Sequence, residues 1–424
     1  MKQGLTALGM TLATTSLMVG APTASAQSTA DMFDRSRNVA VQARPRPAYE
    51  ALGIRTGAFL AYPKVDVTAE YNDNIYARDS GVSDYILRIA PELVLDSDWN
   101  QHFLTMYVRG AVDRYADNED ENIEAYSLGA SGRIDVAREL NVAGGADYVS
   151  TFEPRSAPDS PNNAVSPVEF DVAQAYVSAT RTAGRLRLLG RGDVRSFDYQ
   201  DGRTGAGGVI DQDYRDRDVL SATGRVEYAV SPDTALFFQM VGNKREYDVD
   251  TPAQRARDSK GYELLAGANF EVSNLVRGEV AAGYIEQNYE RGVYKDIDGF
   301  NAKAQLEWFV SEITTVTAFA GRSIEDSANP GAGGMLVSSA GVTIDHELLR
   351  NVVLSGRVSY SDMDYRGIDR EDEMVGASLS ATYLINRNLG ITAALSTQKT
   401  DSRGLQADDD FTINRMTFTL VSQF

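Results

Sequence analysis

Two histidines, His102 and His346, are the natural candidates for acid–base chemistry near neutral pH. The strand pattern described below places both at strand ends on the side of the short connections. A hydrolase built on such a scaffold would need a Ser/His or Asp/His set at the opposite rim or on the lipid face. Asp and Glu, 60 in all, are too numerous to single out one acid–base pair, and the chain has no Cys. We therefore predict no enzyme, no catalytic residue and no cofactor.

A row of arginines is the more distinctive chemical feature. Arg185, Arg187, Arg191 and Arg195 are separated by even steps, so in an extended strand they share one face. Acidic side chains recur on the equivalent face of other predicted strands. The predicted pore-lining basic residues are Arg185, Arg187, Arg191, Arg195, Arg215, Arg217 and Arg225. The predicted pore-lining acidic residues are Asp113, Asp135, Asp147, Glu227, Glu263, Glu271, Glu279 and Glu307.

These charges support two compatible interpretations. A basic wall that faces acidic walls sets a transverse field across a pore, which orients polar solutes and determines ion preference. Alternatively, the charges pair across the lumen and brace the structure.

The elements that would hold these charges are β-strands. Between Phe300 and Val310, apolar side chains alternate with Asn, Lys, Gln and Glu. One face therefore suits lipid and the other suits water. About 18 such segments follow one another, each long enough for the ~9–11 tilted residues that a bilayer requires.

Long polar connections alternate with short ones along the chain. The long ones are 72–83, 153–168, 200–213, 249–260, 326–334 and 401–410, and the short ones lie near 97, 138, 183, 232, 274, 311, 349 and 387. A soluble β-sandwich has no reason to keep this rhythm. The pattern predicts an all-β, transmembrane, antiparallel up-and-down β-barrel of the Gram-negative outer membrane. Its short turns and both termini would face the periplasm, and its longer loops the outside.

The N-terminal region divides into two parts before the barrel, which we place at residues 61–424. Lys2, an apolar stretch and the small residues Ala24 and Ala26 indicate a signal peptide over residues 1–26. The apolar stretch is too short for a membrane anchor. Residues 27–60 carry five arginines around two prolines and lack strand alternation. They would form a basic periplasmic lead-in, a plug, or a docking arm for a periplasmic partner.

The C-terminus and the overall charge indicate further partners. Met416, Phe418, Leu420 and Phe424 resemble the signal read by the barrel-assembly machinery, although Ser422 departs from it. The net charge of −19 makes nucleic acid a poor partner. Acidic stretches at 117–121, 371–373 and 408–410 could bind Ca²⁺ or Mg²⁺ and bridge lipopolysaccharide. They lack ordered calcium-loop spacing, so a solvated acidic rim is the alternative and no metal site is predicted.

Two short segments resemble a known family. They are residues 44–54 and the stretch Tyr71, Asn72, Asp73, Asn74, Ile75, Tyr76 and Ala77. The second is similar to the opening of the "putative β-barrel porin 2" family of outer-membrane proteins. This resemblance implies an outer-membrane barrel, some of whose relatives are associated with exopolysaccharide secretion, and it implies no catalytic residues.

Three functions follow as expectations. The first is a pore for polar molecules, in one version an export duct for an exopolysaccharide whose sugar rings stack on Tyr107 and Tyr176 and whose acidic groups bind the arginines. The second is a non-conducting structural or adhesive barrel that binds divalent cations or surface polysaccharide through its acidic loops. The third is a soluble extracellular enzyme or lectin on a β-sandwich.

Overall fold

The computed structural model describes residues 32, 33, 35–251 and 254–424. In this part of the chain, 18 long antiparallel strands form one closed sheet. Each strand pairs with the next along the chain, and the last, β21 (Phe411–Gln423), closes the barrel by pairing with the first, β2 (Phe59–Asn72). The predicted all-β up-and-down barrel is thus confirmed. The predicted signal peptide lies outside the described residues.

The other barrel strands follow in chain order. They are β3 (Asp84–Ser97), β4 (Phe103–Tyr115), β5 (Ile123–Ala137), β6 (Leu140–Phe152), β7 (Glu169–Ala183), β8 (Leu186–Tyr199), β11 (Arg217–Ser231), β12 (Thr234–Tyr247), β13 (Ser259–Val272), β14 (Val276–Tyr289), β15 (Ile297–Ser311), β16 (Thr314–Asp326), β17 (Gly334–Leu349), β18 (Val352–Arg366), β19 (Glu371–Leu384) and β20 (Leu389–Arg403). The short strand β1 (Ile54–Thr56) pairs with the start of β2, while β9 (Gly202–Arg203) and β10 (Val209–Ile210) form a separate hairpin. Two 3₁₀ turns, η1 (Glu119–Glu121) and η2 (Asp213–Arg215), lie in connections.

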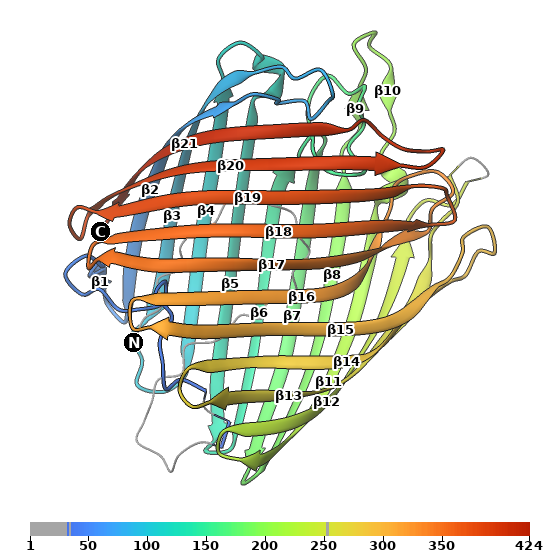
Figure 1. Cartoon of the computed structure of the whole chain (residues 1–424). Coiled ribbons are helices and arrows are strands. Elements are labelled where there is room, and N and C mark those ends of the chain that lie inside the picture. The colour runs from blue at the N-terminus through green and yellow to red at the C-terminus, as the bar shows by residue number, and fades with distance from the viewer. Residues whose placement is uncertain (1–31, 34, 252–253) are drawn as a thin grey trace.

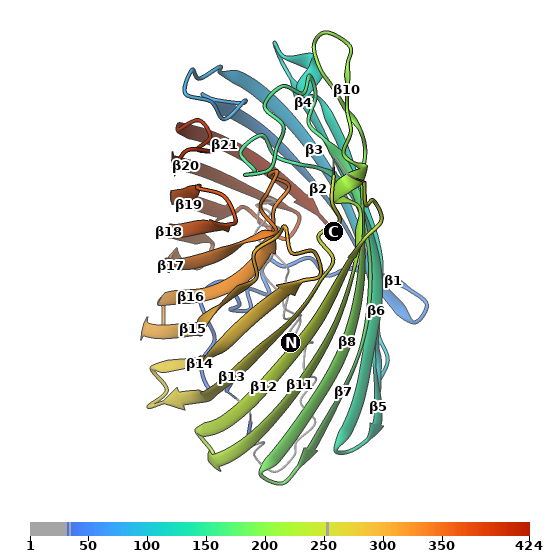
Figure 2. The ribbon, with the colours of Figure 1, turned by 90° about the vertical axis from the view of Figure 1, so that its right-hand side faces the viewer.

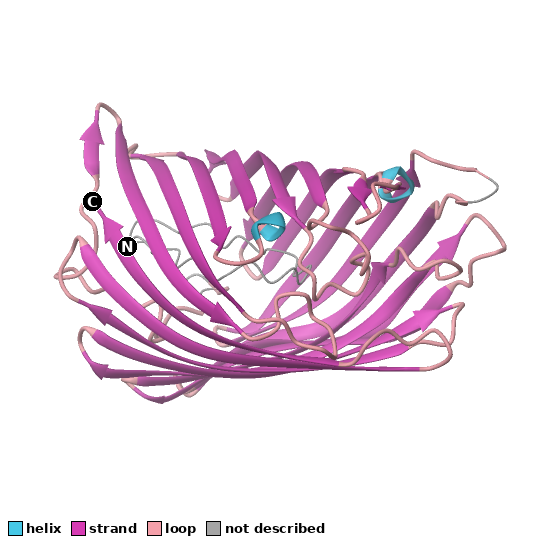
Figure 3. Ribbon diagram, turned by 90° about the horizontal axis from the view of Figure 1, so that it is seen from above, coloured by secondary structure: helices cyan, strands magenta, loops and turns pink. Residues whose placement is uncertain are grey.

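In Figure 1 the strands at the front of the barrel, such as β18 and β19, cross those at the back, such as β5 and β6, at a steep angle. The view from above shows these two walls of the barrel facing each other (Figure 3). Strand tilt of this kind is required to close a sheet into a barrel, because closure staggers the hydrogen-bond register. Closure also pairs the backbone groups that an open sheet edge would leave exposed to lipid.

The two faces of each strand differ as the alternation predicts. On β15, Phe300 and Trp308 are 60% and 50% exposed on the outward face, while Asn301 is fully buried on the inward face. Tyr126 and Tyr148 form an aromatic pair on the outer surface, with ring centroids 6.1 Å apart, as is typical of a membrane interface. No helix in the described part of the chain is long and apolar enough to span a membrane.

The connections alternate in length as predicted. At one end, which we call the short-turn end, strands are joined by tight turns, as at residues 350–351. Ser273 and Asn274 there have φ of 50° and 55°, the left-handed conformation that tight hairpins use. At the other end, the long-loop end, the connections include 153–168, 200–216 and 248–258.

Residues 35–53, here named the N-terminal strap, lie along the inner wall near the short-turn end. Arg35 donates a hydrogen bond to the carbonyl oxygen of Pro232 (2.8 Å), the amide of Val41 donates to Thr315 Oγ1 (3.1 Å), and Gln423 donates to the carbonyl oxygen of Tyr49 (3.4 Å). The strap therefore runs from the β11–β12 turn to β21. Its role as lead-in, plug or docking arm stays a prediction.

Candidate functional site

The lumen wall holds most of the predicted arginines. Arg187, Arg191 and Arg195 lie on the inward face of β8, because the alternating residues Leu188 and Val194 are exposed to the outside. Arg217 and Arg225 lie on the inward face of β11, the neighbour of β8.

Two of the predicted pore-lining arginines, which we call the arginine ladder, lie outside the strands. Arg185 is exposed in the turn before β8, which begins at Leu186, and Arg215 belongs to η2. The even spacing of these arginines continues past the strand ends, so the sequence pattern alone does not mark where a strand stops. Gly184, with φ of 59°, provides the turn that separates Arg185 from the wall.

The end of the ladder nearest the short turns is neutralised by carboxylates. Glu227 accepts hydrogen bonds from both Arg187 and Arg225, the latter at 2.6 Å. Arg225 also donates to Glu279 at 3.0 Å. Charges therefore alternate across β8, β11 and β14. At this level of the lumen the charged side chains pair with one another and brace the wall, as the second interpretation of the sequence predicts.

The middle of the ladder combines an ion pair with an aromatic ring. Arg191 Nε donates to Asp193 at 2.7 Å, and its guanidinium lies 4.1 Å from the centroid of the Tyr176 ring. The guanidinium of Arg109 lies 4.4 Å from the ring centroid of Tyr107 in the same way. One face of each tyrosine is thus covered by a cation.

Most of the predicted acidic residues are also on the inward face with partners. Asp135 is exposed near the short-turn end of β5, where it pairs with Arg133 at 3.1 Å. Glu271 is buried near Arg35 of the strap, with which it interacts electrostatically. The remaining donors are Arg88 for Asp113 (2.6 Å), Gln174 for Asp147 (2.7 Å), Asn301 for Glu263 (2.8 Å) and Arg277 for Glu307 (2.5 Å).

The wall from β17 through β21 to β2 has a different chemistry, which sequence reasoning missed. Its outward face carries exposed apolar residues such as Val358 and Leu379, so the alternating hydroxyl residues face inward. We call this surface the hydroxyl wall: Thr68, Thr343, Ser355, Ser359, Ser378, Ser380, Thr382, Thr392, Ser396, Thr417 and Thr419. Cross-strand hydroxyl contacts join Thr68 to Thr419 (2.8 Å) and Thr382 to Thr392 (3.1 Å). Single Ser and Thr residues give no distinctive sequence pattern. The pairing of adjacent strands brings them together on one surface.

A loop crosses the long-loop end, and we name residues 153–168 the mouth loop. Arg155 donates two hydrogen bonds, of 3.1 and 2.6 Å, to Glu121, whose exposed fraction is 1%. Asp159 accepts from Asn329 (2.8 Å), and Asn162 donates to Asp408 (2.8 Å). These partners belong to connections from different sides of the barrel, and Figure 2 shows loops of this end gathered between the walls. The mouth is therefore narrowed by a loop that is hydrogen-bonded to other connections of this end.

Arg215 anchors the same loop rather than the ladder. It donates to Glu153 at 3.0 and 2.5 Å, and both side chains are buried. Burial disfavours the charge on Arg215, but the hydrogen bonds and charge of Glu153 outweigh this and raise the pKa of Arg215. The prediction that Arg215 lines the pore wall is therefore wrong.

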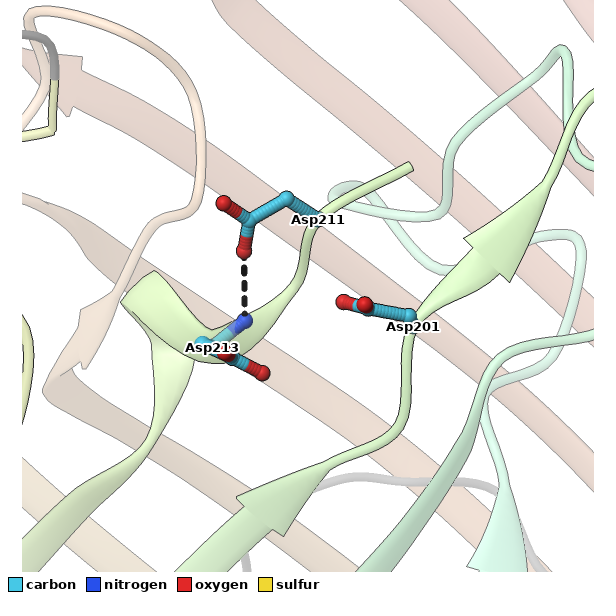
Figure 4. Close-up of side chains that lie close together, drawn as sticks. All are labelled: Asp201, Asp211 and Asp213. Carbon is cyan, nitrogen blue, oxygen red and sulfur yellow. Dashed lines mark hydrogen bonds between the residues drawn. The ribbon is translucent and has the colours of Figure 1, made fainter. Parts of the chain in front are cut away.

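Two groups of carboxylates could hold a divalent cation in the described part of the chain. In Figure 4, Asp201, Asp211 and Asp213 converge beside the β9–β10 hairpin, with one oxygen of each within 4.8 Å of the others. Desolvation and the neighbouring carboxylates raise the pKa of Asp213. The second group is Asp362, Glu371 and Glu373. It includes part of the predicted acidic stretch 371–373.

We expect the junction between η2 and β11 to become more ordered in mild acid. Burial raises the pKa of Asp216 to about 6, assisted by Asp198 and Asp213. Because an unfolded Asp has a pKa of about 3.9, the folded state binds the proton more tightly. Stability therefore increases as the pH falls through about 6 and levels off near 4. Amide exchange of residues 211–218, corrected for intrinsic rates, should be slower at pH 5 than at pH 7.

The variant Asp216→Asn should reduce this difference, while the exposed neighbour Asp218→Asn should preserve it. An unchanged pH dependence in Asp216→Asn would contradict the assignment.

The predicted assembly signal is on the surface. Met416, Phe418 and Leu420 are exposed on the outward face of β21, and Phe424 is exposed just beyond its end. Recognition by the assembly machinery stays a prediction.

A closed β-barrel with an apolar outer surface and a charge-lined interior defines a porin-like outer-membrane protein. The chain belongs to the family described as "putative beta-barrel porin 2", whose profile matches residues 46–424. This confirms the resemblance seen in the sequence and places the protein in the outer membrane of Gram-negative bacteria.

Several solved structures are similar to this chain at low sequence identity. The ferric enterobactin receptor of Pseudomonas aeruginosa is 8% identical, with a TM-score of 0.47, covering 86% of this chain and 80% of that one. OccK1 (OpdK) of Pseudomonas aeruginosa is 9% identical, with a TM-score of 0.44 and coverages of 86% and 99%. The siderophore receptor PiuA of Acinetobacter baumannii is 10% identical, with a TM-score of 0.48 and coverages of 88% and 82%. A comparison with curated proteins gives no significant match.

Proposed function

We propose that this protein is a channel for polar molecules across the outer membrane, with its termini and short turns on the periplasmic side. The observation that carries the proposal is the polar inward face: an arginine and carboxylate wall on β8, β11 and β14 stands with a hydroxyl wall on β17–β21. A barrel of this strand number encloses a lumen wide enough for water unless a segment fills it.

An exopolysaccharide is the solute class that this lining suits. Guanidinium groups bind carboxylates and phosphates through two parallel hydrogen bonds, and the hydroxyl wall offers donors and acceptors to sugar hydroxyls without strong electrostatic trapping. Membership of the family supports a porin-like barrel, and the lining of the lumen supports the exopolysaccharide as its solute. Deletion of the gene should abolish the surface polymer, and unchanged polymer would contradict the duct while leaving the channel intact.

Conductance tests the channel directly. Refolded full-length mature protein in a planar lipid bilayer should give stable conductance steps with ion selectivity. The triple variant Arg187→Glu, Arg191→Glu, Arg195→Glu should shift this selectivity strongly toward cations, because it reverses the charge of one lumen wall.

A control with the same change in charge uses exposed arginines outside the lumen. It is the triple variant Arg138→Glu, Arg181→Glu, Arg185→Glu, which should change selectivity much less. A correctly folded, heat-modifiable barrel that conducts nothing would contradict the proposal.

A non-conducting adhesive barrel is the second candidate, and the exposed carboxylate group of Asp201, Asp211 and Asp213 favours it. In that case Ca²⁺ should increase binding of the folded protein to lipopolysaccharide or surface polymer. The effect should disappear in the double variant Asp201→Asn, Asp211→Asn. Binding that is independent of Ca²⁺ would contradict this candidate.

A further inference from the structure

The arginines of the lumen are unequally compensated. The ion pairs described above neutralise Arg187, Arg191 and Arg225, so the unbalanced positive charge lies farther along the wall, toward the long loops. Four guanidinium groups meet there. They belong to Arg195 on β8, Arg217 on β11, Arg245 on β12 and Arg257 in the following loop.

The carboxylate of Asp326, at the end of β16, accepts hydrogen bonds from two members of this cluster. Arg217 Nε donates to Asp326 Oδ2 at 2.9 Å, and Arg245 donates to the other oxygen. Arg257 interacts with the same carboxylate electrostatically. Asp159 of the mouth loop also faces Arg257, but it is shared with Arg215. The cluster therefore holds more positive than negative charge.

Arg195 is the least compensated of the four. Within the described residues it has no carboxylate oxygen within 4.0 Å and no hydrogen-bond acceptor. Asp193 stabilises the charge of Arg195 electrostatically but is already hydrogen-bonded to Arg191, and the charges of Arg245 and Arg217 act against that of Arg195. Such a guanidinium inside a protein normally has an anionic partner.

Three buried donors beside the cluster also lack acceptors. Tyr289 Oη, Tyr247 Oη and Arg257 Nε have no hydrogen-bond partner among the described residues, although their residues are only 8%, 8% and 5% exposed. All three can donate a hydrogen bond, and buried donors are rarely left unpaired. A Cβ added at Gly334 would lie 2.5 Å from Tyr289 Oη, so glycine keeps this hydroxyl free of an adjacent side chain.

We propose that Arg195, Arg257 and Tyr289, with Arg217 and Arg245 behind them, form a binding site for an oxyanion in the lumen. The unpaired groups are all donors, so the ligand must be an acceptor with negative charge: a phosphate, a sulfate or a carboxylate such as that of a uronic acid. This inference deepens the proposed function, since it rests on solutes reaching the lumen. It assigns the selectivity of the channel for anionic solutes to this one site rather than to all the arginines of the wall.

Calorimetric titration of the refolded full-length protein with inorganic phosphate, at constant ionic strength in detergent, tests the site without requiring conduction. We expect saturable binding that weakens at least tenfold in Arg195→Gln and severalfold in Tyr289→Phe. Arg195→Lys should lie between wild type and Arg195→Gln, because it keeps the charge but loses the two-pronged geometry. Heat-modifiable gel mobility verifies that each variant is folded.

The matched control is Arg357→Gln on the far wall, where the guanidinium lies 5.3 Å from the Phe319 ring centroid. It should bind phosphate like the wild type. Competition by galacturonate, but not by galactose, would extend the ligand class to sugar carboxylates. Galacturonate that fails to compete would restrict the site to phosphate and sulfate.

Absence of phosphate binding to a folded, conducting barrel would overturn the site and leave the channel standing. Equal affinities of wild type and Arg195→Gln would do the same. Phosphate binding by a barrel that does not conduct would support the site and contradict the channel.

Discussion

Replacement of residues 156–163 of the mouth loop by a short Gly/Ser linker is expected to increase the single-channel conductance severalfold. The loop is bonded to connections on different sides of the barrel through Asp159 and Asn162, so it occupies the cross-section of the mouth. Ion flow is limited by the narrowest part of a pore. The replacement retains Glu153 and Arg155, whose partners Arg215 and Glu121 hold the N-terminal end of the loop.

A control for this experiment is available in the β9–β10 hairpin, which projects away from the barrel (Figure 1). Replacement of its exposed tip, residues 205–208, should leave the conductance close to that of the wild type. The same conductance in the mouth-loop variant and in the wild type would show that the narrowest point lies elsewhere. The N-terminal strap would then be the next segment to alter.

The second large effect is expected from Glu347→Gln, which should release the N-terminal strap. The Glu347 side chain is 7% exposed and lies 3.1 Å from Arg46 and 3.6 Å from Arg44. Removing one partner of a buried ion pair costs about 3 kcal/mol or more, because the other charge stays buried without compensation. Amide exchange in residues 38–50 should therefore become roughly a hundredfold faster.

The exposed residue Glu312 is the matched control, since its backbone carbonyl oxygen, and not its carboxylate, accepts the hydrogen bond from Arg44. Glu312→Gln should leave exchange in the strap unchanged. Equal exchange in Glu347→Gln and wild type would mean that the other hydrogen bonds of the strap, such as that from the Val41 amide to Thr315 Oγ1, are sufficient to hold it. A released strap is also the form in which residues 35–53 could act as a docking arm.

The wrong predictions for Arg185 and Arg215 show that strand ends cannot be located from the alternation of residues alone. Their even spacing matches that of Arg187 and Arg217, yet one lies in a turn and the other in η2. Alternation describes a strand interior well, but its end is set by turn geometry and by the neighbouring loops. The same limit hid the roles of Glu153 and Glu121, whose partners are 62 and 34 residues away.

By itself, the sequence determined the class of fold, the number of strands, the alternation of short turns and long loops, and the family. These properties are local: a strand between lipid and water must alternate apolar and polar residues, as Phe300 to Val310 do, whatever its neighbours are. Only the tertiary structure decided which charges meet. Closure of the barrel brings Asp326 to Arg217, 109 residues away, while Arg195 has no carboxylate oxygen within 4.0 Å among the residues that the structure describes. The sequence contains these charged groups, but only the stagger and curvature of the sheet determine the distances between them.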